Sequence, residues 1–277
     1  MESKRYLPEL NRFSIVTALS TLLLGLTFVL PPSSGQSSTA IFGVLFNLQV
    51  NIYSFFSLLI ALIALTGSVW VLRSHPQFSD ASRITWKLLP NVILPALSIF
   101  ILSFTLREMV RSNVWWVVYV LGSLLFGLVL TAEYNVLDLR FDTHPAASLG
   151  LIGLSHALFL ILAVVLRTGR MRLYVVIPLI VLAAIFIGLR TINLRTQGSW
   201  RLGYALFISL LVGQLAVSLQ YFFLNPLQYG ILLTSALYIL ISISCGIIQS
   251  LKLRELLVEP ALMVILSSAL LILAGQL

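Results

Sequence analysis

Uninterrupted apolar runs of about twenty residues recur along this chain, and few folds tolerate them. Such a run matches a hydrocarbon core of roughly 30 Å crossed by a helix that rises 1.5 Å per residue. The runs do not alternate apolar and polar residues, as the strands of a membrane barrel do. Because lipid does not tolerate unpaired backbone groups, the spanning segments must then be helices. The pattern predicts an all-α fold, a polytopic transmembrane helical bundle.

The composition excludes a soluble globular protein. Of the 277 residues, 59% are hydrophobic and 9% are charged, and the mean hydropathy is +1.04. Soluble domains carry roughly 25% charged residues, so this chain could not cover a surface that faces water. Its 17 Lys and Arg residues lie in short clusters between apolar runs and form no basic stripe. We therefore expect contacts with membrane lipids, especially anionic headgroups, and no nucleic-acid partner.

We expect about nine spans, within a range of eight to ten, in a single integral membrane domain that covers residues 1–277. The first apolar run is longer than the core of a signal peptide, so we interpret it as a retained helix. The expected spans lie near residues 13–30, 50–72, 86–106, 113–132, 148–166, 173–189, 202–223, 227–249 and 258–275. Residues 40–49 are apolar but too short to span. They are interpreted as an interfacial helix, an extension of the second span or a re-entrant segment.

The distribution of positive charge predicts a cytoplasmic N-terminus. With that orientation, twelve Lys and Arg residues lie on the cytoplasmic side and five on the other. The basic loop 167–172 falls on the wrong side and opposes this assignment. The chain has no N-x-S/T site, which is compatible with a bacterial inner membrane. We expect a multi-pass protein of the plasma membrane, with membrane proteins as possible partners.

The densest polar cluster, EYNVLDLRFDTHP, begins at Glu133 at the expected cytoplasmic end of the fourth span. If that helix continues, Asp138 and Asp142 lie at i and i+4 on one face. Two carboxylates so placed can share a hard cation, which in turn can hold a diphosphate. The alternative is a solvated loop that fixes the helix end at the interface.

The run NVLDLRFD within this cluster resembles the first aspartate-rich motif of membrane prenyltransferases. The resemblance covers these eight residues and implies a transferase that acts on lipid-linked diphosphates. Tyr134 and Asn135 stand where the family motif has Asn and Asp. The loop RTINLRTQGSWR, which would correspond to the second motif of the family, contains no acidic residue.

His156 lies halfway along the fifth expected span, where ionisable groups are costly and suggest function by default. Ser155 and Gln214, the latter in the middle of the seventh span, are its candidate partners. Asn91 follows Pro90 in the third span, and broken helices expose backbone to substrates in transporters. His156, Gln214 and Asn91 are therefore candidates for a ligand or proton path. An interhelical hydrogen bond at His156 and helix packing around the prolines are the alternatives.

Glu133 and Arg190 lie at the cytoplasmic ends of the fourth and sixth expected spans and form a candidate charge pair. Independent extension of both side chains to the headgroups is the alternative. The single Cys245 lies within an apolar run and is interpreted as a small buried side chain. We expect no metal site and no cofactor.

Three functions stay open at this point. The first is a non-enzymatic scaffold or accessory subunit, which the scarcity of polar groups within the spans favours. The second is a transporter or channel for a small solute that uses His156, Gln214 and Asn91. The third is a membrane enzyme in which Asp138 and Asp142 are catalytic.

Overall fold

The computed structural model confirms a bundle of membrane-length helices. It describes residues 8–29, 36–41, 44–49, 52–75, 84–109, 112–137, 144–169, 171–196, 198 and 200–275. The helices are α1 (Leu10–Leu26), α2 (Ile52–Leu72), α3 (Ile84–Glu108), α4 (Val114–Val136), α5 (His144–Thr168), α6 (Leu173–Arg195), α7 (Leu202–Gln220), α8 (Pro226–Ile248) and α9 (Leu253–Ala274). Within the described part of the chain, α2 to α9 supply eight helices long and apolar enough to cross a membrane. The chain is thus a multi-pass membrane protein.

Helix α1 is shorter than the other helices, with 17 residues from Leu10 to Leu26. A turn continues it over residues 27–29. This helix and turn overlap the first of the expected spans, 13–30, but α1 is too short to be counted among the eight candidate spans.

Residues 40–41 and 44–49 form β structure, so the two helical interpretations of the segment 40–49 are wrong, and a re-entrant position stays a prediction. Strand β1 (Gln36–Ile41) pairs antiparallel with β2 (Val44–Gln49), with Gln36 opposite Gln49 and Ile41 opposite Val44. The helical interpretations failed because they considered residues 40–49 alone, without residues 36–39 as part of a partner strand. Two short strands can satisfy their backbone N–H and C=O groups by hydrogen-bonding to each other in a hairpin.

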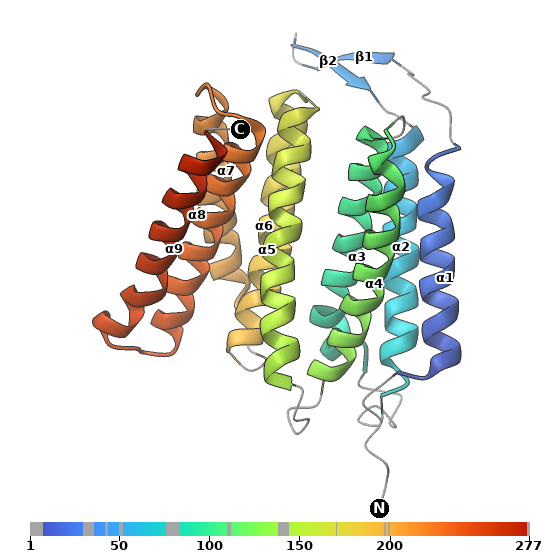
Figure 1. Ribbon diagram of the computed structural model, residues 1–277, viewed down its shortest axis with the longest axis horizontal. Coiled ribbons are helices and arrows are strands. Elements are labelled where there is room, and N and C mark those ends of the chain that lie inside the picture. The colour runs from blue at the N-terminus through green and yellow to red at the C-terminus, as the bar shows by residue number, and fades with distance from the viewer. Residues whose placement is uncertain are drawn as a thin grey trace, which may run out of the picture. The chain divides into compact units, whose positions relative to one another are not determined.

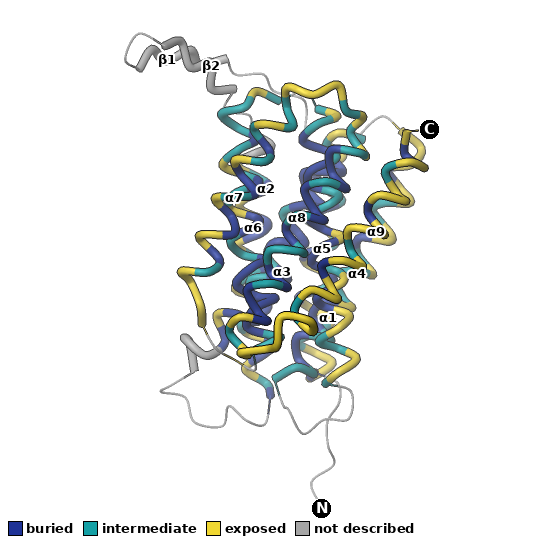
Figure 2. The backbone as a smooth tube through the Cα atoms, turned by 90° about the vertical axis from the view of Figure 1, so that its left-hand side faces the viewer, coloured by how far each residue is buried: buried dark blue, intermediate teal, exposed yellow. Residues whose placement is uncertain are grey.

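The chain divides into two compact units, which we describe separately. The first comprises residues 1–88 and 95–141, and the second comprises residues 89–94 and 142–277. Within each unit the helices lie side by side along their length (Figure 1). Figure 2 marks the exposed residues in yellow. Many of them have large apolar side chains, as lipid-facing residues do.

The first unit is held together by an apolar core from α1, α2, α3 and α4. Its buried members include Leu24, Ile60, Leu102 and Phe126. Small residues bring the helices close: a Cβ at Gly122 would lie 2.7 Å from a methyl of Leu102. The hydrophobic effect does not drive helices together in lipid, so the van der Waals contacts of such close packing stabilise their association instead.

The second unit packs α6 against α7, and α8 against both α5 and α9. Glycines again mark the contacts. A Cβ at Gly213 would lie 2.7 Å from Val181 Cγ2, and one at Gly230 would lie 2.7 Å from Val164 Cγ2. Helix α9 is mostly exposed and buries a narrow face at Pro260, Ser267 and Ala274. This peripheral helix therefore forms one open wall of the unit.

Candidate functional site

A tight turn between α8 and α9 places two polar helix faces opposite each other. Helix α8 ends at Ile248, and Ser250 adopts a left-handed conformation with φ of 56°. The backbone N–H of Leu251 then donates to the carbonyl of Gly246 over 3.0 Å, as in a Schellman cap. The chain reverses within four residues, so the first turns of α9 run back along the last turns of α8.

Each of the two helices presents a row of polar side chains at helical spacing. On α8, Tyr238, Ser242 and Gln249 recur at i, i+4 and i+11, which places them on one face. On α9, Glu255 and Glu259 are separated by one turn and also share a face. The turn brings these faces together, as the hydrogen bond of 2.6 Å from Ser242 Oγ to Glu259 Oε2 demonstrates.

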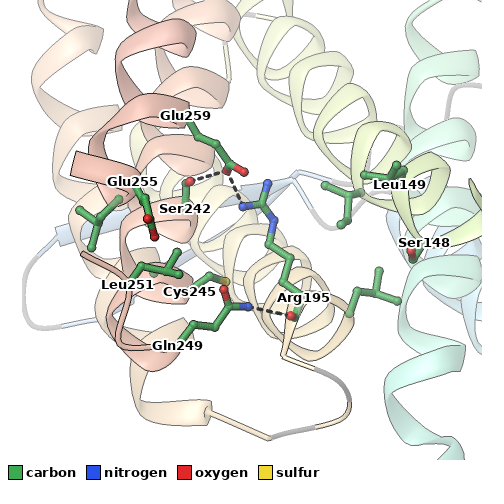
Figure 3. A pocket seen from close by; sticks show the side chains of 13 residues that line it. Ser148, Leu149, Arg195, Ser242, Cys245, Gln249, Leu251, Glu255 and Glu259 are labelled. Atoms are coloured by element: carbon green, nitrogen blue, oxygen red, sulfur yellow. Dashed lines mark hydrogen bonds and ion pairs between the residues drawn. The ribbon is translucent and has the colours of Figure 1, made fainter. Parts of the chain in front are cut away.

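Arg195, the last residue of α6, contacts both of these helices. Its Nη1 donates to Glu259 Oε2 over 2.7 Å, and its Nη2 donates to the Tyr238 hydroxyl over 3.1 Å. Its guanidinium carbon also lies 5.3 Å from the centre of the Tyr238 ring. The Gln249 amide donates to the backbone carbonyl of Arg195 over 3.0 Å. Arg195 thus holds three points on α8 and α9 at once, and Figure 3 shows its contacts with Glu259 and Gln249.

The Arg195 side chain points away from the helix ends. Its backbone lies level with Gln249, which caps α8, whereas its guanidinium lies near Glu259, further from the helix ends (Figure 3). The guanidinium also contacts the Tyr238 hydroxyl. An arginine at the end of a membrane helix ordinarily extends toward water and the headgroups. Its side chain is 18% exposed and that of Glu259 is 54% exposed, so the pair lies at the edge of a partly open space.

That space is a cavity of about 310 Å³ between the ends of α5, α6, α8 and α9. We call it the Arg195 cavity. Its polar wall includes Ser148, Arg195, Ser242, Gln249, Glu255 and Glu259. Its apolar wall is made chiefly of leucines, and Cys245 lies between the two. A mixed wall of this kind, around a volume in the range of small-molecule sites, suits a ligand with polar and apolar parts.

The formal charges of the residues that line the cavity sum to −1. Arg195 contributes one positive charge, and Glu255 and Glu259 contribute one negative charge each, which sums to −1. In the described part of the chain Glu255 has no hydrogen-bond or ion-pair partner, and it is exposed. The site is therefore equipped to hold a group that carries positive charge beside Glu255.

The sequence-based candidates for a ligand or proton path lie apart from this cavity lining. His156 is 8% exposed, and its Nδ1 lies 2.8 Å from the Ile152 carbonyl, to which it donates a hydrogen bond. Its ring meets the Tyr238 ring edge-on at 5.2 Å. Gln214, by contrast, is exposed on α7, and Asn91 is buried on α3.

The candidate charge pair joins residues of different units. Glu133 belongs to the first unit and Arg190 to the second, and both are buried. The Arg190 Nη1 donates to Asn193 Oδ1 over 3.0 Å. Pairing between Glu133 and Arg190 stays a prediction. Asp138 and Asp142 lie outside the described residues, as does the run between them.

The described residues contain no cluster of three or more His, Cys, Asp or Glu side chains that could hold a metal ion. The site found here rests instead on residues that the sequence analysis missed or interpreted separately. The sequence did not lead us to connect Tyr238, Ser242 and Gln249 as a site, although their helical spacing opposite Glu255 and Glu259 was a signal. Cys245 is buried, as expected, but it also lines the cavity.

Comparison with known proteins identifies a family. No curated protein and no solved structure matches the chain. The model of a family described as "Protein of unknown function (DUF5656)" matches residues 33–274, which include α2 to α9 and every residue of the Arg195 cavity. Since the match extends over most of the chain, this protein belongs to the DUF5656 family.

Proposed function

We propose that this chain is a non-enzymatic membrane protein, in the manner of an accessory subunit, whose second unit binds a polar ligand in the Arg195 cavity. The observation that carries the proposal is the inward guanidinium of Arg195 at the wall of an open cavity. Charged groups drawn toward the hydrocarbon layer are costly and suggest function by default.

The unused bonding capacity of the site supports binding rather than a purely structural role. A guanidinium has five N–H donors, and the contacts of Arg195 to Glu259 and Tyr238 engage its Nη1 and Nη2 groups. Both contacts to the Glu259 carboxylate end on the same oxygen, Oε2. An ion pair that only joined α6 to α9 would need no adjoining cavity.

The lone Cys245 offers a direct test, since it lines the cavity and is the single cysteine of the chain. We expect a small thiol reagent to modify Cys245 slowly in native membranes and in mild detergent, and faster once exhaustive washing in a harsh detergent has removed the ligand. The Cys245→Ala/Ser250→Cys variant is the control, because position 250 is exposed at the same helix ends but outside the cavity lining. Equal changes of rate at the two positions would refute ligand occupancy.

A transporter is the second candidate, and a specific chain of contacts favours it. From the cavity, Glu259 contacts Arg195, Arg195 contacts Tyr238, and the Tyr238 ring meets His156 in the middle of α5. Polar groups that follow one another into a bundle can mark a path for an ion or a solute. Transport would use this path in place of the expected one through Gln214.

Water access beside His156 distinguishes transport from binding alone. Ser155 precedes His156 and is buried. In a Cys245→Ala background, a transporter predicts that Ser155→Cys reacts with water-soluble thiol reagents. A closed binding site predicts no reaction there, while an Ile152→Cys variant at the cavity wall reacts in both cases.

We also propose that the protein lies in a plasma membrane with its N-terminus in the cytoplasm. The Arg195 cavity would then open to the cytoplasm, at the end where Lys252 and Arg254 begin α9. Positive residues favour that side of a membrane, where they contact anionic lipids.

A further inference from the structure

We propose that the Arg195 cavity takes the zwitterionic headgroup of an amine-bearing phospholipid. This inference rests on the proposed ligand-binding function and specifies the chemical class of the ligand. Three features of the cavity carry it: its depth in the membrane, the order of its charges along the helices and its apolar wall.

The depth of the cavity matches the region where headgroups meet acyl chains. Ser242 on its wall lies about six residues, or roughly 9 Å, from the end of α8. The polar layer of a bilayer is roughly 5–8 Å thick on each side of the hydrocarbon core. With the helix ends placed at the membrane surface, a cavity that extends this far would cross the headgroup layer and reach the outer acyl chains.

The charges along the cavity follow the order of charges in such a lipid. The Arg195 guanidinium lies at the level of Glu259, and Glu255 lies one turn, roughly 6 Å, nearer the helix end. In an aminophospholipid the phosphate lies between the acyl chains and the amine. A lipid of the adjoining leaflet would thus place its phosphate at Arg195 and its amine at Glu255.

The net charge of the lining selects for the amine. An anionic lipid brings a phosphate without a compensating cation to a lining whose charge sums to −1. An aminophospholipid adds an ammonium group, which can donate hydrogen bonds to Glu255 and meets its charge. Such charge-assisted bonds are roughly twice as strong as neutral ones.

Apolar surface for the acyl chains adjoins the cavity. Leu149 and Leu251 line it and are 70% and 42% exposed. Next to Glu259 on α9, Val258 and Leu262 are also exposed. Acyl chains that leave the headgroup site therefore continue along an apolar helix face, which a free, water-soluble zwitterion would not use.

Modification of Cys245 in lipid nanodiscs of defined composition tests this inference. We expect phosphatidylethanolamine, added to a phosphatidylcholine background, to slow the reaction by about tenfold relative to phosphatidylcholine alone. Phosphatidylglycerol should leave the rate unchanged. The Glu255→Gln variant should lose the effect of phosphatidylethanolamine, and Glu9→Gln, an exposed glutamate of the first unit, should retain it.

The outcomes of this experiment distinguish a wrong ligand class from a cavity that binds no ligand at all. Equal or stronger protection by phosphatidylglycerol would overturn the requirement for an amine while the cavity remained a binding site. Stronger protection by free phosphoethanolamine than by the lipid would overturn the lipid as source. Retained protection in Glu255→Gln would overturn the role of that carboxylate. If neither these lipids nor a total membrane extract altered the rate, the inference and the proposed function would both fail.

Discussion

At the scale of single residues, Arg195 determines the character of the site. It is the last residue of α6, so an extended side chain at this position could reach the headgroup layer. It instead donates to Glu259 and Tyr238, 64 and 43 positions away in the sequence. Hydrogen bonds that involve charged groups are worth roughly 1.5–3 kcal/mol, which offsets part of the cost of drawing the guanidinium inward. Glu259 is half exposed, and solvent reduces this gain.

We predict that Arg195→Gln lowers the free energy of unfolding in detergent by about 1–2 kcal/mol. The change removes the charge-assisted bond to Glu259 and the bond to Tyr238. Thermal unfolding measures it, and Arg201→Gln serves as the control, because Arg201 is exposed just before α7. In a double-mutant cycle with Glu259→Gln, additive effects would show that the two side chains do not interact.

At the scale of secondary-structure elements, close helix contacts and one sharp turn build the second unit. Gly213 lets α7 approach α6, and Gly246 lets α9 approach α8, where its Cβ would lie 3.1 Å from Leu256 Cδ1. The turn at Ser250 then sets the register in which Glu259 meets Ser242. The contact at Gly213 and the turn at Ser250 are local, and either position can be changed without altering a residue of the cavity lining.

We predict that Gly213→Ala destabilises the protein by about 1–3 kcal/mol, because the added methyl would lie 2.7 Å from Val181. Valine is β-branched and has little freedom to turn away. Gly203 begins the same helix and has open space around it, so Gly203→Ala should be neutral or mildly stabilising. Equal melting temperatures for the two variants would contradict the tight contact between α6 and α7.

We predict that Ser250→Gly raises the free energy of unfolding by about 0.5 kcal/mol, since glycine adopts a left-handed conformation without strain. Ser250→Val should lower it, because branched side chains tolerate that conformation poorly. Ser218→Gly is the control for this substitution, because Ser218 lies inside α7, where glycine should lower the free energy of unfolding. A stabilising Ser250→Val would show that the turn has a different geometry.

At the scale of the whole molecule, the fold was predictable and the site was not. The eight long helices follow from apolar runs that match the bilayer, a signal carried by each segment alone. The hairpin was missed because strand pairing depends on a partner segment, here β1 for β2. The site was missed for the same reason. Arg195 and Glu259 are 64 positions apart in the sequence, and no local pattern joins residues so far apart.

We predict that the helix ends around the Arg195 cavity face the cytoplasm, as the excess of Lys and Arg on that side requires. In a Cys245→Ala background, Ser250→Cys should react with an impermeant thiol reagent in inverted vesicles but not in intact cells. Tyr221→Cys, exposed at the opposite ends of α7 and α8, should show the reverse. Labelling of Ser250→Cys in intact cells would invert the orientation.

Native mass spectrometry of the full-length protein, released from mild detergent, tests the central claim most directly. The wild-type chain should carry a bound ligand, and the Arg195→Gln variant should have lost it while remaining folded. An adduct of the same mass and abundance on both proteins, or none on either, would contradict a ligand held by Arg195.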